Sequence, residues 1–269
     1  MAWWRRQRWD GTVGRPRSSN AASSFHLTWD LGGPEPGREW ISVEATLEVL
    51  VPPAVPALYF WALQASFVNR GREGGAGHLG LQWHPDHPGS TAVNWGGYDA
   101  TGAELRGSVA ALPSALDNPN TRDLAWLAGV AYRLCIRRAT DAEAAAQGAP
   151  GGLVAWRGEV TDLSSGTTTV VRDLWAAGSG LAAPVVWSEV FAACDDPSVV
   201  VRWHDLRVGD QAGRPTRPER VSVSYQSRAE GGCVTTDVSV DEVGLRQVTG
   251  TVRRTPPGAR VPVAQSDRS

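Results

Sequence analysis

The chain has 269 residues, a formal net charge of −2 and 13 tryptophans. This near-neutral charge gives no strong attraction to nucleic acid or to an anionic membrane surface, so neither is expected as a partner. No run of about 18 apolar residues occurs, which argues against a membrane-spanning helix. The N-terminus has arginines but no apolar segment after them, so the chain is predicted to be cytoplasmic as written, or secreted if a leader has been removed.

Residues 1–24 are predicted to be a flexible arm, in which Trp3, Trp4 and Trp9 stand among arginines. From Phe25 the character changes, because short runs of Val, Thr, Trp and Tyr alternate with Gly, Pro, Asp and Asn. This pattern is typical of antiparallel strands joined by turns. We therefore predict an all-β, antiparallel jelly-roll sandwich over residues 25–208, with strands near 25–31, 40–51, 57–69, 76–84, 90–96, 103–110, 129–138, 152–162, 166–175, 184–192 and 198–208.

The remaining segments have distinct compositions. Thr140 and Glu143 have the spacing of a capping box, which makes the segment up to Gly148 the best helix candidate. Its place between two predicted strands favours a decorated loop. Residues 209–219 are rich in Gly, Pro and Arg and are predicted to be a linker. Residues 220–256 are expected to form an appended C-terminal β-element that packs on the sandwich, and residues 257–269 a loose tail.

Alternation sorts the predicted strands into two faces. One face is large and apolar and carries Trp61, Trp83 and Trp95, which are predicted to fill the core. The opposite face is small and polar. Small residues beside amides can form a concave surface that hydrogen-bonds a hydroxylated ligand, and the residues expected there are Gln64, Ser66, His78, Gln82, His84 and Asn94.

The segment HPDHPG offers His84, Asp86 and His87 as potential metal ligands. Its two prolines and its glycine also predict a hairpin turn, and the spacing supplies no third protein ligand. We predict no metal and no cofactor. Three cysteines lack the C-x-x-C spacing of a zinc site, and a Cys194–Cys233 disulfide is one open alternative.

Glu189 is a candidate catalytic carboxylate, since it could pair with Asp195, Asp196 or Asp205. Glycosidases use two carboxylates that flank the scissile bond. No tight acidic motif is present, and no nucleophile elbow, P-loop or metalloprotease helix occurs. A solvated or ion-paired carboxylate is therefore the favoured interpretation, and no catalytic residue is assigned.

The order of YFWALQASF, GGAGHLGLQW, NWGGYD, YRLCIRR, WRGEVTDLSSG, VVWSEVF and VVVRWHDLRV resembles the concanavalin A-like lectin and glucanase sandwiches. It looks most similar to an uncharacterised bacterial group of carbohydrate-associated domains. The resemblance implies glycan binding on the concave sheet by Gln64, Gln82 and Asn94. The catalytic acid motif of the glucanases and the calcium loop of the legume lectins are both missing.

These observations lead to one main functional hypothesis and two alternatives. The main hypothesis is a non-catalytic, lectin-like module that binds a glycan or polysaccharide through Gln64, His78, Gln82 and Asn94. The first alternative is a carbohydrate-active hydrolase or lyase that uses His78, His84 or Glu189. The second is a structural or protein-interaction module without a small-ligand site.

Overall fold

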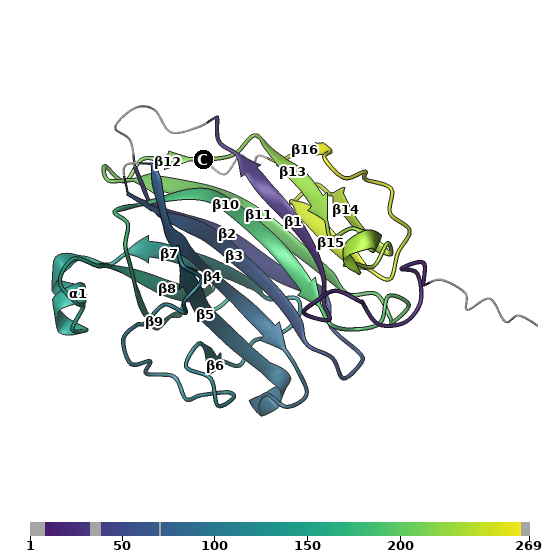
Figure 1. Ribbon diagram of the computed structural model, residues 1–269, viewed down its shortest axis with the longest axis horizontal. Helices are drawn as coiled ribbons and strands as arrows, with labels where there is room; N and C mark the ends of the chain where they lie inside the picture. The colour runs from purple at the N-terminus through teal and green to yellow at the C-terminus, as the bar shows by residue number, and fades with distance from the viewer. Residues whose placement is uncertain (1–8, 33–38, 70, 265–269) are drawn as a thin grey trace, which may run out of the picture.

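The alternating segments form long antiparallel strands in a computed structural model, which describes residues 9–32, 39–69 and 71–264. Trp3 and Trp4 of the predicted arm, and residues 265–269 of the predicted tail, lie outside the described residues. The fold is an all-β sandwich (Figure 1), so the predicted fold class is confirmed. Among the described residues, no helix has the length and apolar character needed to cross a bilayer.

Within the described residues, the first layer contains eight strands. Its order is β16 (Arg260–Pro262), β13 (Arg220–Tyr225), β1 (Ser23–Asp30), β10 (Gly180–Val190), β3 (Tyr59–Asn69), β4 (Arg72–Trp83), β5 (Thr91–Asp99) and β6 (Thr121–Asp123). Pro184 interrupts β10 where its register with β3 shifts between Ala182 and Val185, which is where a residue without an N–H group is tolerated.

The second layer has the order β14 (Thr236–Val240), β15 (Leu245–Thr249), β11 (Val200–Asp210), β2 (Trp40–Val51), β7 (Ala131–Arg138), β8 (Val154–Asp162) and β9 (Thr168–Ala176), and β12 (Pro215–Thr216) pairs with β11. The two layers are linked where Leu181 of β10 pairs with Trp40 of β2. Strands from the C-terminal part of the chain therefore extend both layers, since β13 joins β1 and β15 joins β11.

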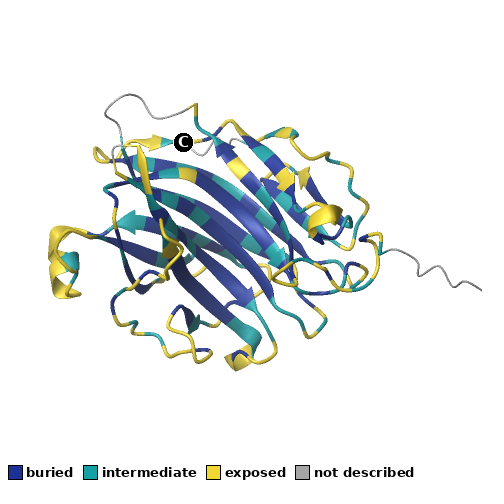
Figure 2. Ribbon diagram, in the orientation of Figure 1, coloured by how far each residue is buried: buried dark blue, intermediate teal, exposed yellow. Residues whose placement is uncertain are grey.

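Inward-facing side chains of both layers form the main core. The buried residues lie mainly along the strands (Figure 2). Trp61 and Trp95 are fully buried, while Trp83 is half-buried and packs against the same core. Trp156 and Trp203 enter from the second layer. The packing of the two sheets therefore accounts for several of the 13 tryptophans, because each buried aromatic ring removes a large apolar area from water.

Helix α1 and residues 103–110 can be compared with the sequence expectations. Helix α1 (Asp141–Ala146) begins at Thr140 with the predicted capping box complete. Residues 103–110 were predicted to be a strand, but they contain only isolated bridges, at Glu104 and Gly107. Short 3-10 turns occur at Pro88–Ser90 and Arg228–Glu230.

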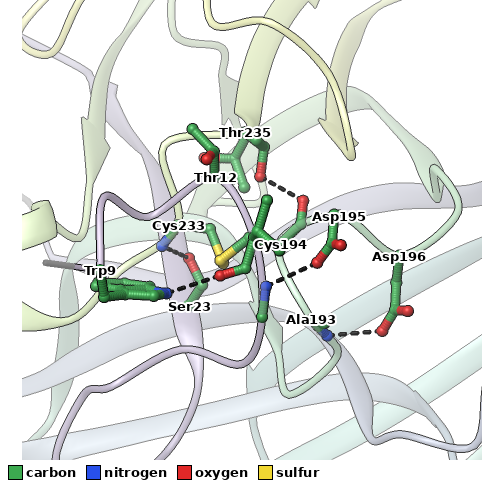
Figure 3. The surroundings of a disulfide bond; sticks show 12 residues. Trp9, Thr12, Ser23, Ala193, Cys194, Asp195, Asp196, Cys233 and Thr235 are labelled. Carbon is green, nitrogen blue, oxygen red and sulfur yellow. Dashed lines mark hydrogen bonds between the residues drawn. A yellow bond between two sulfur atoms is a disulfide. The ribbon is translucent and has the colours of Figure 1, made fainter. Parts of the chain in front are cut away.

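Cys194 and Cys233 form a disulfide that joins the loop after β10 to the loop before β14 (Figure 3). The N-terminal segment packs beside it, where Cys194 N donates to Gly14 O (2.8 Å) and Val234 N donates to Gly11 O (2.9 Å). The described part of the predicted flexible arm is thus held by specific hydrogen bonds. The third cysteine, Cys135, is a free thiol on β7.

Candidate functional site

The face of the first layer that points away from the main core carries a second, smaller hydrophobic cluster, of Phe60, Ala62, Val185 and Trp187. Trp187 of β10 lies at its centre. Its ring contacts Phe60 at a centroid distance of 4.8 Å, His78 at 5.9 Å and His26 at 6.3 Å. Trp187 Nε1 also donates to Gln64 Oε1 (3.1 Å). The name Trp187 cluster is used below for all of these residues, which are His26, Phe60, Ala62, Gln64, His78, Val185 and Trp187.

Strand register explains why these side chains meet. His26 on β1 pairs with Trp187 on β10, which pairs with Ala62 on β3. In the next row, Gln64 on β3 pairs with His78 on β4. Alternate residues of each strand share a face, so the small side chain of Ala62 leaves space between rows that the surrounding rings fill.

His78 is half-buried, yet its environment strongly disfavours the charged imidazolium. Desolvation lowers the pKa of His78 to about 4, and the Asn94 carboxamide opposes this effect only in part. The imidazole is therefore neutral at pH 7. A group that is partly exposed but strongly desolvated is characteristic of a recessed surface rather than a flat one, because surrounding protein displaces water on most sides.

Glu189 of β10 lies on the same face, one row from Trp187, and pairs with Phe60 across the strands. Its carboxylate accepts a hydrogen bond from Asn20 Nδ2 (2.6 Å), which comes from the docked N-terminal segment. Burial raises the pKa of Glu189, and the Asn20 hydrogen bond limits that rise. A carboxyl group of this kind is suited to proton transfer, since its pKa is moved towards neutrality.

The four predicted ligand-binding residues share this face, but their amides are not freely presented. Gln64 is engaged by Trp187, and Gln82 and Asn94 are only 6% and 7% exposed. Asn94 Nδ2 donates to Thr121 Oγ1 (2.9 Å). Asn94 Oδ1 is buried without an aligned hydrogen-bond donor, although the carboxamide is near enough to favour a protonated His78.

The HPDHPG segment is a turn in the structure. His84 Nδ1 accepts a hydrogen bond from Asp86 N (3.1 Å), and the His84 and His87 rings lie 5.6 Å apart. Within the described part of the chain, no group of three or more His, Cys, Asp or Glu side chains could hold a metal ion.

The carboxylates considered as partners of Glu189 have structural contacts elsewhere. Asp195 accepts from Gly14 N (2.7 Å), and Asp196 accepts from Ala193 N (2.7 Å) in the same turn. Asp205 belongs to β11 in the other layer, where it pairs with His204 Nδ1 (3.0 Å). A two-carboxylate glycosidase arrangement around Glu189 therefore has no support in these contacts.

Sequence reasoning missed two members of the site. His26 lies in β1, whose alternation of Phe25, Leu27 and Trp29 could have placed it on the outer face. Asn20 was missed because the segment before β1 has no periodicity from which a docked conformation could be predicted. It reaches Glu189 from 169 positions away in the chain.

No family model matches the chain, and no curated protein matches it. Among solved structures, the chain is similar to scytalido-glutamic peptidase with a peptide-based transition state analog, with a TM-score of 0.40 and 11% identity over 90% of this chain and 100% of that chain. It is also similar to SCP-B, a member of the eqolisin family of peptidases, in complex with the tripeptide Ala-Ile-His, with a TM-score of 0.41 and 11% identity over 88% of this chain and 99% of that chain. These likenesses are too distant to transfer a site or an activity. The concanavalin A-like resemblance has no support from family models or curated proteins.

Proposed function

We propose that the chain is a hydrolase in which Glu189 acts as the general acid and base, on the face that carries the Trp187 cluster. The observation that supports this proposal is the desolvated Glu189 carboxyl, whose pKa is raised by burial. Such a group holds a proton more readily than an ordinary carboxyl group, so it can donate that proton to a leaving group and then accept one from water.

The surrounding residues suit this role. Phe60 pairs with Glu189 across the strands, and the Phe60 ring contacts Trp187. These apolar rings would limit water near the carboxyl group and so strengthen electrostatic interactions there. The neutral His78 imidazole can donate or accept a hydrogen bond to a substrate without adding charge. These features favour the hydrolase hypothesis over the non-catalytic one formed from sequence alone.

The test is a substrate screen with the wild-type chain and Glu189→Gln. The panel contains neutral and acidic polysaccharides and denatured proteins, scored by new reducing ends, unsaturated products and new amino termini. Any hydrolysis by the wild type should fall by a factor of at least about 10² in Glu189→Gln, as expected for loss of a general acid–base. Glu219→Gln, an exposed carboxyl group just before β13, is the matched control. Equal activity of wild type and Glu189→Gln would exclude this assignment.

A second candidate function is lectin-like glycan binding without catalysis. Asn94 Oδ1 favours it, since a buried acceptor without an aligned donor could receive a ligand hydroxyl. The double variant Gln82→Ala with Asn94→Ala should then weaken glycan binding, with each lost hydrogen bond costing about 0.5–1.5 kcal/mol. A glycan array that shows no binding by the wild type would exclude this candidate.

We also propose that the protein works in an oxidising compartment. The support is the Cys194–Cys233 disulfide, because such bonds persist mainly outside the reducing cytosol. Mass spectrometry of the protein isolated from its native source, with thiols blocked before lysis, tests this. Reduced Cys194 and Cys233 in that sample would contradict it.

A further inference from the structure

Two arginines meet where the edges of the two layers come together. Arg122 belongs to β6, the last strand of the first layer, and Arg172 to β9, the last strand of the second. The segment after β5 closes this edge, because Leu105 N donates to Gly97 O (2.9 Å) and Ser108 N donates to Asp173 O (2.8 Å). The backbones of both arginines lie in paired strands, since Arg122 pairs with Val93 and Arg172 pairs with Gly158.

Neither arginine has a carboxylate partner. Arg172 is only 6% exposed and Arg122 is half-buried, and the Nε atoms of both are buried without a hydrogen-bond acceptor. Desolvation and then repulsion from Arg122 lower the pKa of Arg172 to about 10. In the part of the chain that the structure describes, neither guanidinium forms an ion pair. Buried charges are normally paired, so this arrangement needs an explanation.

Asn120 links Arg172 to the carboxyl group of Glu104. Arg172 Nη2 donates to Asn120 Oδ1, and Asn120 Nδ2 donates to Glu104 Oε1. Glu104 is exposed and raises the pKa of Arg172 slightly, but it faces two positive charges. The edge therefore keeps a net positive charge beside two Nε–H donors that lack an acceptor.

We propose that Arg122 and Arg172 form a binding site for an oxyanion, such as a carboxylate or phosphate group. Planar guanidinium groups bind such oxygens through paired, charge-assisted hydrogen bonds, and two adjacent guanidiniums would share one anion. A bound anion would remove the repulsion between the arginines.

The location of this oxyanion site suggests what carries the anion. Asn120, which Arg172 contacts, packs over Gly96, where an added Cβ would lie 2.9 Å from Asn120 Cγ. Gly96 pairs directly with His78 of the Trp187 cluster. The oxyanion site thus lies at the end of the same face, and its anion is an acidic group of the ligand. This last step rests on the proposed function, whereas anion binding itself does not.

The experiment compares sodium phosphate, sodium acetate and sodium chloride at equal ionic strength and pH 7, with the melting temperature as readout. Phosphate or acetate at about ten times its Kd should raise the melting temperature of the wild type by about 3–6 °C relative to chloride. Arg122→Gln should abolish this rise. Arg106→Gln, an exposed arginine in the adjacent segment, should keep it.

Two further variants separate the possible failures. Without anion, Arg122→Gln should melt at or above the wild-type temperature, because it relieves repulsion of Arg172; a purely structural role would lower the melting temperature. Glu189→Gln should keep the anion-induced rise, so a failed hydrolase assignment leaves this result intact. Equal melting temperatures in all three salts, or an unchanged rise in Arg122→Gln, would overturn the oxyanion site.

Binding measurements with acidic and neutral ligands test whether the ligand carries the anion. If a substrate or glycan is found in the screens, Arg122→Gln should bind its acidic form at least about tenfold more weakly, the equivalent of one charge-assisted hydrogen bond. Binding of a neutral analogue should not change. An equal loss of affinity for the acidic and neutral ligands would show that the arginines do not bind the charged group of the ligand.

Discussion

Desolvation shifts the pKa values of single residues on the face that carries the Trp187 cluster. The pKa of His78 shows how such a shift affects the stability of the fold. Its pKa is about 4 in the folded protein, against an ordinary value of 6.5. Between these values the unfolded chain binds a proton that the folded protein does not. The contribution of the neutral His78 side chain to the free energy of unfolding is therefore complete above pH 6.5. It is lost as the pH falls towards 4.

We expect His78→Gln to remove about 2–3 kcal/mol of the fall in unfolding free energy between pH 7 and pH 4, given 1.36 kcal/mol per pKa unit and partial exposure. Urea melts at a series of pH values measure this. Parallel pH profiles for the wild type and His78→Gln would show that His78 titrates normally.

Asn20 should tune the acidity of Glu189. Its hydrogen bond stabilises the carboxylate form and lowers the Glu189 pKa against the effect of burial. In Asn20→Ala the Glu189 pKa should therefore rise, because the carboxylate loses this hydrogen bond. Carbon-13 NMR titration of glutamate carboxyl groups measures it without a known substrate.

Thr12→Ala is the control for that titration, because Thr12 contacts Asp10 in the same segment and not Glu189. It should leave the Glu189 titration unchanged. If a hydrolase activity is found, the alkaline limb of its pH profile should move to higher pH in Asn20→Ala. A fall in the Glu189 pKa would mean that Asn20 does not stabilise the carboxylate.

At the scale of elements, the approach of the two layers depends on Gly158 of β8. A Cβ atom there would lie 2.8 Å from the ring of Trp95, which is fully buried and cannot move aside. We expect Gly158→Ala to lower the unfolding free energy by about 1–3 kcal/mol through overpacking. Gly151→Ala, which has open space around its Cβ, should have little effect. Equal urea midpoints for the two variants would contradict this packing model.

The strands and the core could be predicted from alternation, because Trp61 and Trp95 stand in regular strands where parity fixes the face. The same rule fails in β11, where strict alternation would place Asp205 on the face of Trp203. Asp205 has φ of +52° at a register shift between His204 and Arg207, so Leu206 enters the core instead. No residue type at this bulge predicts it from sequence, since non-glycine residues rarely adopt positive φ.

The candidate site was only partly predictable for a related reason. Gln64 and His78 were expected on one face, and β3 and β4 pair them directly. The hydrogen bond between Asn20 and Glu189, and the electrostatic interaction between Arg122 and Arg172, join segments far apart in the chain. Local periodicity carries no information about such contacts, which depend on how the layers and their edges come together.

For the molecule as a whole, the Cys194–Cys233 disulfide lies where three distant parts of the chain meet. Next to it, Gly14 N donates to Asp195 Oδ1, and Arg17 N donates to Gly231 O (2.8 Å). The N-terminal segment that carries Asn20 is thus held by the two loops that the disulfide connects. Loosening this junction should release the segment from Glu189.

The double variant Cys194→Ala with Cys233→Ala should therefore have two effects. The unfolding free energy should fall by about 2–4 kcal/mol, since the bridge closes a chain segment with a sequence separation of 39 residues. Amide hydrogen exchange over residues 11–20 should become faster, and the Glu189 pKa should rise as in Asn20→Ala. Reductant should destabilise the wild type but not the double variant, because Cys135 is unpaired in both. Unchanged exchange over residues 11–20 would mean that the N-terminal segment docks independently of the disulfide, and that Glu189 is insulated from the redox state of the protein.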